Sequence, residues 1–276
     1  MKEENKRILK IIPAILLLPA LGLACFRAWL LVSNIDVSNG LYTDTALGTM
    51  FGWLLFALLA ISLLIGFFVK KFTFDRPIKN ESVMAAFAAS VCAVMMAAIF
   101  CMNVFDMVTG RRAFGVLLVA ETVICIPGVI YFFRICVKGA NPDANSSQAH
   151  SLLPLFPALY AAIRTISLFI DVSKPINASQ RSFVLLTLVF IMMFFVTEAE
   201  YALPRDEMEH KKKQALLNSL TAKYYALGLT VSCLVLVIIM PYAFASAFWI
   251  YDTDTLLYNV MDICFGMYAL VRVFSV

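Results

Sequence analysis

The run ALGTMFGWLLFALLAISLLIGFFV, from Ala46 to Val69, decides the fold class of this chain. It contains no ionisable residue, and it is longer than the roughly 20 apolar residues that a helix needs to cross the hydrocarbon core of a bilayer. Backbone amides in that core must pair within the protein, because an unpaired one costs several kcal/mol in lipid. The run therefore predicts a transmembrane helix.

Similar stretches occupy most of the remaining chain, which predicts an all-α, polytopic transmembrane helical bundle of about eight spans. The other predicted spans are Ile11 to Val32, Val83 to Val104, Phe114 to Phe133, Leu152 to Ile170, Phe183 to Ala202, Tyr225 to Ile250 and Leu256 to Phe274. The last is the weakest candidate, because it contains Asn259 and Asp262. Only short connections remain, without room for a soluble domain.

The composition agrees with this fold class. Of the 276 residues, 62% are hydrophobic and 14% are charged, whereas soluble domains have about 45–50% and about 25%. The formal net charge of +4 is small and dispersed, which argues against nucleic-acid binding. The lipid bilayer is the environment that we expect for this chain.

Basic residues are unevenly divided between the two sides of the predicted bundle. One side receives Lys2, Lys6, Arg7, Lys10, Lys70, Lys71, Arg76, Lys79, Arg134, Lys138, Arg205, Lys211, Lys212, Lys213 and Lys223, and the other receives Arg111, Arg112, Lys174 and Arg181. Lysine and arginine accumulate in cytoplasmic loops. This predicts a multi-pass protein of the plasma membrane with both termini in the cytoplasm.

The first and fifth predicted spans resemble each other. The segment from Pro19 to Ser38 reads PALGLACFRAWLLVSNIDVS, and that from Pro157 to Ser173 reads PALYAAIRTISLFIDVS. Two interpretations stay open. One is a duplication, with an N-terminal half (1–137) and a C-terminal half (151–276) as parallel repeats of four helices. The other is a chance similarity between two apolar helices.

Four ionisable residues lie deep within predicted spans: Arg27, Glu121, Arg164 and Asp262. With a rise of about 1.5 Å per residue, all four lie about 8–10 Å from the outer ends of their helices. A charge at such a position costs at least ~2.5–3.5 kcal/mol and normally faces a partner or water. We therefore take these four residues as candidate substrate-binding residues.

Two roles for these charges remain open. The arginines can pair with Glu121 and Asp262, or reach outward to Asp36 and Asp171, and simply hold the helices in register. Alternatively, the four side chains line an outward-facing cavity. There an arginine would bind a carboxylate or phosphate, and a carboxylate would carry a coupling proton.

Two further polar segments receive structural interpretations. Glu198 and Glu200, at the inner end of the sixth predicted span, have two interpretations: the inner station of a proton path, or an interfacial cap. We favour the cap, because Pro204 and basic residues follow them. The run from Lys211 to Lys213 is predicted to be a solvated loop near lipid headgroups.

No motif identifies a reaction. The only histidines, His150 and His210, lie in predicted loops, and the sequence contains no HExxH, GxSxG, GxxxxGK[ST] or GxGxxG pattern. Its seven cysteines form no CxxC pair and are interpreted as small hydrophobic residues. The sequence thus predicts no enzyme, no cofactor and no metal site.

The sequence favours a transporter or permease for a small molecule or ion, without identifying that substrate. The alternative is a non-transporting membrane sensor or an interaction subunit of a membrane complex. Small-residue stripes predict close helix packing, within the chain, with a membrane-protein partner or in a homo-oligomer. They consist of Gly48 and Gly52 in one span and Ala85, Ala89, Ala93 and Ala97 in another.

Overall fold

The computed structural model describes residues 3–36, 41–72, 82–111, 115–140, 152–170, 178–203, 210–248 and 256–276. Their helices are α1 (Glu3–Ser33), α2 (Thr45–Val69), α3 (Val83–Thr109), α4 (Val116–Ala140), α5 (Leu155–Ile170), α6 (Ala178–Ala202), α7 (His210–Leu234), the π-helical segment η1 (Val235–Ile239), α8 (Met240–Ala247) and α9 (Leu256–Phe274). Helices α7, η1 and α8 follow one another without a break and form one long span. The prediction of an all-α, polytopic helical bundle is confirmed.

Within the described residues, seven helices are long and apolar enough to cross a membrane. The weakest predicted span, Leu256 to Phe274, is among them. Among the eight predicted spans, only the fifth corresponds to a shorter helix, α5. It has 16 residues and so extends about 24 Å at 1.5 Å per residue. Residues 152–154 form a turn, and α5 begins after it at Leu155. Pro157 lies in the first turn of the helix, where proline is tolerated.

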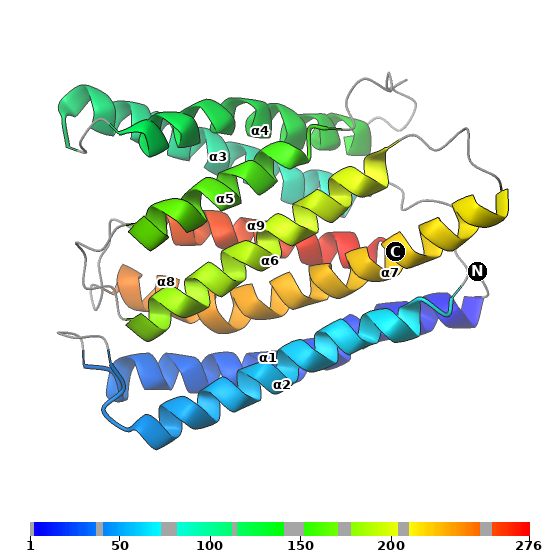
Figure 1. Ribbon diagram of the computed structural model, residues 1–276, viewed down its shortest axis with the longest axis horizontal. Helices are drawn as coiled ribbons and strands as arrows, with labels where there is room; N and C mark the ends of the chain where they lie inside the picture. The colour runs from blue at the N-terminus through cyan, green and yellow to red at the C-terminus, as the bar shows by residue number, and fades with distance from the viewer. Residues whose placement is uncertain are drawn as a thin grey trace.

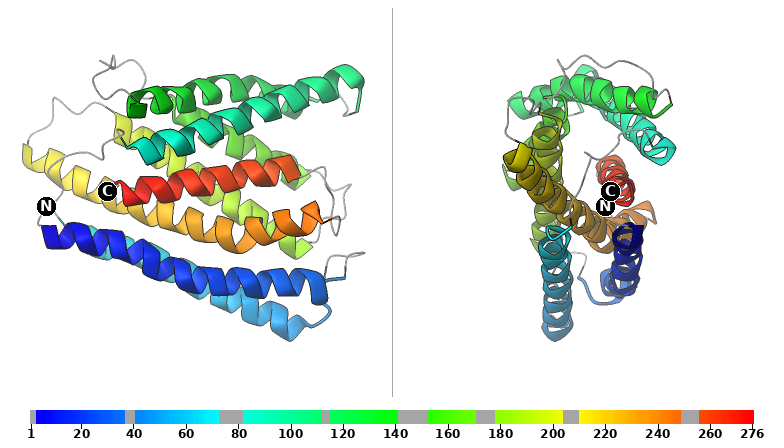
Figure 2. Two further views of the ribbon diagram at one scale, coloured as in Figure 1. Left: turned by 180° about the vertical axis from the view of Figure 1, so that it is seen from behind. Right: turned by 90° about the vertical axis from the view of Figure 1, so that its right-hand side faces the viewer.

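The helices lie side by side and alternate in direction (Figure 1). Helices α1 and α2 form one edge of the bundle and α3 and α4 the opposite edge, with α5, α6, α7 and α9 between them (Figures 1 and 2). Helix α1 begins, and α9 ends, at the same end of the molecule. The large apolar side chains exposed on α1 to α4 give these edge helices a surface suited to lipid.

The span formed by α7, η1 and α8 is the most buried of the candidate spans. Helix α7 contacts α1, α2, α6 and α9. Small residues allow a close approach to α2, since a Cβ atom on Gly66 would lie 2.8 Å from the Cβ of Ala226. The hydroxyls of Ser62 and Thr230 are 2.8 Å apart at the same crossing.

The two predicted halves are interleaved in space. Among the described residues, neither α1 nor α2 packs against α3 or α4. Instead, α2 packs on α7 and α1 on α8, whereas α3 packs on α9 and α4 on α5. The duplication of 1–137 as 151–276 stays a prediction, but the first half reaches its packing partners mainly in the second.

One local prediction was wrong, and another is met within the chain by only one of its two residues. The lysine run from Lys211 to Lys213 lies in the first turn of α7 and not in a loop. In the GxxxG stripe, Gly48 packs against the ring of Tyr42, whereas a Cβ on Gly52 would meet no atom within 4 Å. The alanine stripe of α3 does serve packing, because Ala85, Ala89 and Ala93 are buried.

Candidate functional site

Helix α9 contributes to two groups of buried polar residues. We call the first the Asp262 cluster; it consists of Asn103, Glu121, Tyr160, Arg164, Tyr258 and Asp262. We call the second the Glu198 cluster; it consists of Tyr131, Glu198, Tyr224, Tyr268 and Arg272. Asp262 lies in the N-terminal half of α9 and Arg272 lies in its last turn. The two clusters therefore lie toward opposite ends of this helix.

The Asp262 cluster is centred on an ion pair between α5 and α9. Nη1 of Arg164 lies 2.6 Å from Oδ1 of Asp262, and the two residues are 6% and 0% exposed. The same nitrogen donates to the carbonyl oxygen of Tyr258 at 3.3 Å. The guanidinium carbon also lies 4.8 Å from the centre of the Tyr258 ring. A buried pair with these additional contacts fixes the position of Arg164.

Neighbouring helices complete this cluster. The hydroxyl of Tyr258 donates to Oδ1 of Asn103, on α3, at 3.0 Å. Tyr160, one turn before Arg164 on α5, interacts electrostatically with Arg164, Asp262 and Glu121. Glu121, on α4, also acts electrostatically on Arg164. Four helices therefore meet at this cluster, and three of the four predicted site residues belong to it.

Several polar atoms of the Asp262 cluster are fully buried but lack a hydrogen-bond partner within the described part of the chain. They include Oδ2 of Asp262, the hydroxyl of Tyr160 and Nδ2 of Asn103. Leaving such a group without a partner costs about 1–3 kcal/mol. Three such atoms lie in one cluster, on α3, α5 and α9. They would lower the stability of the fold considerably if the cluster had only a structural role.

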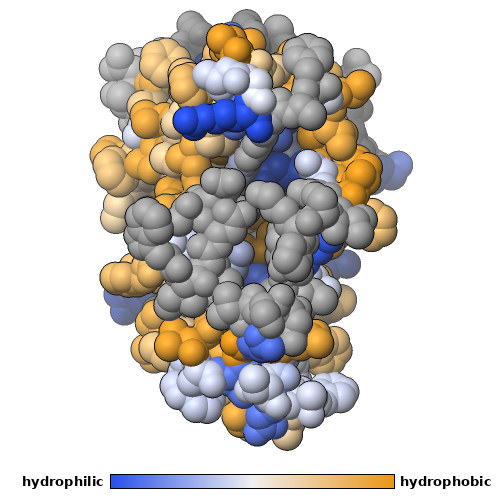
Figure 3. Space-filling model, turned by 90° about the vertical axis from the view of Figure 1, so that its left-hand side faces the viewer, coloured by the Kyte–Doolittle hydropathy of each residue, from blue (hydrophilic) through white to orange (hydrophobic). Residues whose placement is uncertain are grey.

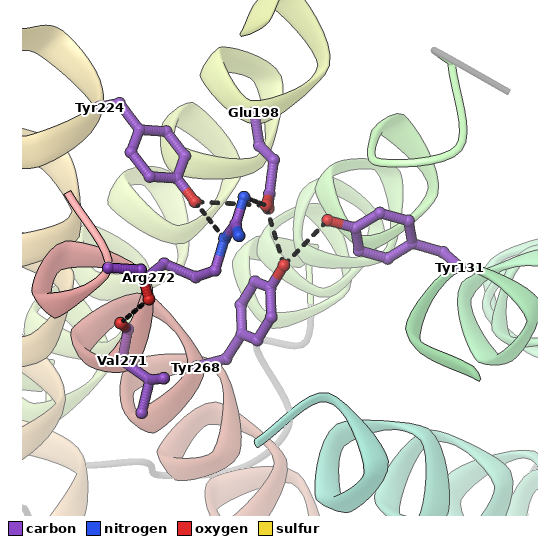
Figure 4. Close-up of polar contacts among 7 residues, drawn as sticks. Tyr131, Glu198, Tyr224, Tyr268, Val271 and Arg272 are labelled. Carbon is purple, nitrogen blue, oxygen red and sulfur yellow. Dashed lines mark hydrogen bonds and ion pairs between the residues drawn. The ribbon is translucent and has the colours of Figure 1, made fainter. Parts of the chain in front are cut away.

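The Glu198 cluster joins α4, α6, α7 and α9 (Figure 4). Oε1 of Glu198 lies 3.1 Å from Nη2 of Arg272 and accepts hydrogen bonds from the hydroxyls of Tyr268, at 2.8 Å, and Tyr224, at 3.2 Å. Nε of Arg272 donates to the Tyr224 hydroxyl at 2.9 Å. The hydroxyl of Tyr131 lies 3.2 Å from that of Tyr268. Glu198, Arg272 and Tyr224 thus close a ring of charge-assisted contacts, from which Tyr268 and then Tyr131 extend.

The sequence interpretation of Glu198 as an interfacial cap was wrong. Glu198 is 6% exposed and Arg272 is 3% exposed, so both are buried between helices. Glu200 does lie near the surface, where it pairs with Lys223 at 2.8 Å. Arg272 pairs with a buried carboxylate, as Arg164 does. Because Arg272 lies near the end of its span, the sequence does not distinguish it from the basic residues that lie outside the membrane on the same side. Its position opposite Glu198, near the end of α6, was the available signal.

Aromatic rings separate the two clusters. Phe265, between Asp262 and Tyr268 on α9, lies 6.1 Å from Tyr160 of the Asp262 cluster, measured between ring centres. It also packs on Phe132 at 5.9 Å and on Phe195 at 5.1 Å. These two rings in turn pack on Tyr268 of the Glu198 cluster. We call Phe132, Phe195 and Phe265 the aromatic block.

Arg27 has contacts of a different kind. It is fully buried, and its guanidinium carbon lies 5.0–5.6 Å from the ring centres of Tyr42, Phe51 and Phe183. It donates to the hydroxyl of Tyr42, and its Nη2 donates to Oε1 of Gln180 at 2.5 Å. These contacts tie α1 to α6 and to the segment before α2. The outward contact considered for Arg164, with Asp171, falls outside the described residues.

Hydrophilic residues are visible between apolar ones at the end of the molecule at which α9 begins (Figure 3). Apolar side chains cover much of the flanks in the same view. This distribution is the one expected if polar groups lie inside the bundle and apolar ones face lipid.

Comparison with known proteins gives no relative: no family model, curated protein or solved structure matches the chain. In the part of the chain that the structure describes, no group of three or more histidine, cysteine, aspartate or glutamate residues could hold a metal ion. The chemistry of the site therefore has to be argued from its own residues.

Proposed function

We propose that this multi-pass membrane protein moves a small solute or ion across the bilayer. One observation carries the proposal: two buried arginine–carboxylate pairs lie at opposite ends of α9, with the aromatic block between them. Ionisable residues inside a membrane are expensive and usually mark the path of a substrate or proton. Two such groups on one helix are more than helix registration requires.

The arrangement suits alternating access. Each ion pair joins α9 to a different neighbour, α5 at one end and α6 at the other. Opening one pair while the other stays closed would expose the interior to one side only. The π-helical segment η1 in the adjoining central span supports such a change, because π-segments interrupt regular helical bonding and occur frequently at functional sites.

In this proposal the predicted site residues have distinct roles. Arg164, Asp262 and Glu121 contact the solute, and the Glu198 cluster closes the opposite end. Arg27, predicted as a fourth binding residue, instead links α1 to α6 through Gln180 and to the segment before α2 through Tyr42. Reaction chemistry is not part of the proposal.

A second candidate is a non-transporting membrane component, such as a sensor or an interaction subunit. The direct closure of both ion pairs, at 2.6 and 3.1 Å, favours it, because a closed pair is sufficient to hold two helices together without any ligand. The two candidates differ in one respect: only a transporter moves solute when it is isolated from every other protein.

The test is counterflow in liposomes containing the purified protein. Vesicles are loaded with unlabelled ethanolamine, glycolate, glycerol or rubidium ion, and uptake of the same labelled solute is followed. We expect transient, protein-dependent accumulation of at least one probe. Glu198→Gln should reduce its rate at least tenfold, because the variant carboxamide cannot neutralise Arg272.

Glu200→Gln is the matched control. It removes the carboxylate of an exposed ion pair, two residues from Glu198, and should leave counterflow unchanged. Uptake equal to that of protein-free vesicles for all four probes would contradict the transport proposal. It would favour the non-transporting component, provided that the protein remains folded in the vesicles.

A further inference from the structure

We infer that the Asp262 cluster binds a small solute that carries an ammonium group together with a hydroxyl or carbonyl oxygen. The inference rests on the proposed function for the identity of the solute as cargo, although binding can be measured without transport. It is carried by three buried polar atoms and by the charges around them.

The three atoms belong to residues that are fully buried on three different helices. They are Nδ2 of Asn103 on α3, the hydroxyl of Tyr160 on α5 and Oδ2 of Asp262 on α9. Each lacks a hydrogen-bond partner within the described residues. Their residues belong to one network, since Tyr258 binds Asn103 and stacks on Arg164, which pairs with Asp262.

The chemistry of these atoms defines the complementary ligand. Oδ2 of Asp262 can only accept when the carboxylate is ionised, so it requires a donor. Nδ2 of Asn103 can only donate, so it requires an acceptor, while the Tyr160 hydroxyl can do either. A ligand that satisfies all three must combine a strong donor with an oxygen acceptor.

Charge selects the donor. Oδ1 of Asp262 already binds Arg164, and the negative charge of Glu121 acts on both Arg164 and Tyr160. The cluster therefore holds two carboxylates and one guanidinium, so an anionic ligand would meet a net negative charge, whereas an ammonium group would be attracted by it. A neutral donor would also form a charge-assisted hydrogen bond with the Asp262 carboxylate, but an ammonium group adds the attraction between opposite charges. We therefore favour an ammonium donor over a neutral or anionic one.

Three probes of similar size and different charge test the inference: ethanolamine, ethylene glycol and glycolate. The protein is held in phosphatidylcholine nanodiscs, whose headgroup ammonium carries no N–H donor. A ligand that binds the folded state raises the unfolding temperature. We expect ethanolamine to stabilise the protein most, ethylene glycol weakly and glycolate least.

Tyr160→Phe is the informative variant, because it removes a hydroxyl that bonds to no described residue and so should fold normally. We expect it to weaken ethanolamine binding roughly tenfold, the effect of one hydrogen bond. Tyr225→Phe is the matched control: this buried tyrosine binds the carbonyl of Leu9, away from both clusters, and its loss should leave the affinity unchanged. Asp262→Asn should weaken binding by about 30-fold.

Stronger stabilisation by glycolate, equal stabilisation by all three probes, or an unchanged affinity in Tyr160→Phe would overturn the inference. Nanodiscs of phosphatidylethanolamine form a second arm. If that lipid stabilises the protein and Tyr160→Phe abolishes the effect, the ammonium class holds and the headgroup is its source. Ethanolamine binding without counterflow would leave the inference standing and contradict only the proposed function.

Discussion

Glu198 and Glu200 lie two residues apart in one turn of α6, yet they have opposite environments. A displacement of two residues turns a helix by about 200°, so one side chain faces the bundle and the other faces away. Glu198 meets Arg272 and two tyrosine hydroxyls in the interior, whereas Glu200 meets Lys223 at the surface. The partner, rather than the residue type, decides what each carboxylate contributes.

Replacing Glu198 by glutamine should destabilise the protein strongly. The variant keeps the shape of the side chain but leaves Arg272 buried without its counter-charge, which costs about 3–5 kcal/mol. Thermal unfolding of the purified protein in detergent measures the loss. An unfolding temperature within experimental error of the wild type would show that Arg272 is not buried against this carboxylate.

Glu200→Gln serves as its control for stability as well. The exposed pair with Lys223 contributes less than about 1 kcal/mol, because water and salt screen it. The informative quantity is the difference in unfolding temperature between Glu198→Gln and Glu200→Gln, because both variants remove one negative charge from the same helix turn.

At the scale of elements, the crossing of α2 and α7 depends on small residues. Gly66 faces Ala222 and Ala226, and a Cβ at Gly66 would approach the Ala226 Cβ to 2.8 Å and the Ala222 carbonyl oxygen to 3.3 Å. Between helices in a membrane, such close backbone approach replaces the hydrophobic driving force that acts in water. Gly66 does not belong to the predicted stripe, which consists of Gly48 and Gly52 near the other end of α2.

Gly66→Leu should separate these two helices. The larger side chain cannot fit between α2 and α7 without moving them, and overpacking of this kind costs about 1–3 kcal/mol. We expect a lower unfolding temperature. Gly52→Leu is the control on the same helix, because a Cβ there meets nothing within 4 Å, so its stability should be unchanged or slightly raised. Equal effects of the two substitutions would contradict the observed crossing.

The length of α7 shows the limit of reading helices from apolar runs. The expected span began at Tyr225, but the helix starts at His210. The added residues include lysine, glutamine, alanine and leucine, which have high helix propensity, and Gln214 donates to Asn218 one turn later. A hydropathy criterion detects membrane crossing and does not detect a helix that continues into water.

At the scale of the whole molecule, the alternating helices bring the basic segments to one end. Helix α1 begins there, α2, α4, α6 and α9 end there, and α3, α5 and α7 begin there (Figure 1). The described basic residues at these helix ends include Arg7, Lys70, Lys138 and Lys212. By the positive-inside rule, this concentration of basic residues predicts that this end faces the cytoplasm.

Fusions to reporter proteins test the predicted orientation. In a bacterial host, green fluorescent protein joined after Val276 should fluoresce, and alkaline phosphatase joined there should be inactive, because both would lie in the cytoplasm. Fusion after Arg111, at the opposite end of the bundle, should give an active phosphatase. The reverse pattern would mean that the basic end faces outward, and activity at both positions would contradict the alternation of spans.

The sequence by itself determined the fold class and the approximate positions of most spans. These properties follow from local composition, because the cost of placing a charge or an unpaired amide in lipid depends on the residue and its depth alone. Arg164 and Asp262 could thus be selected as candidates before their partners were known.

Only the tertiary structure decided which charges meet. Arg27 and Arg164 occur in similar sequences, yet aromatic rings surround the first and a carboxylate binds the second. Arg272 lies near the end of its span, and only the packing of α6 against α9 shows that Glu198 is its partner. Such pairings depend on how each helix is rotated and which helices it contacts, and those relations join residues far apart in the chain.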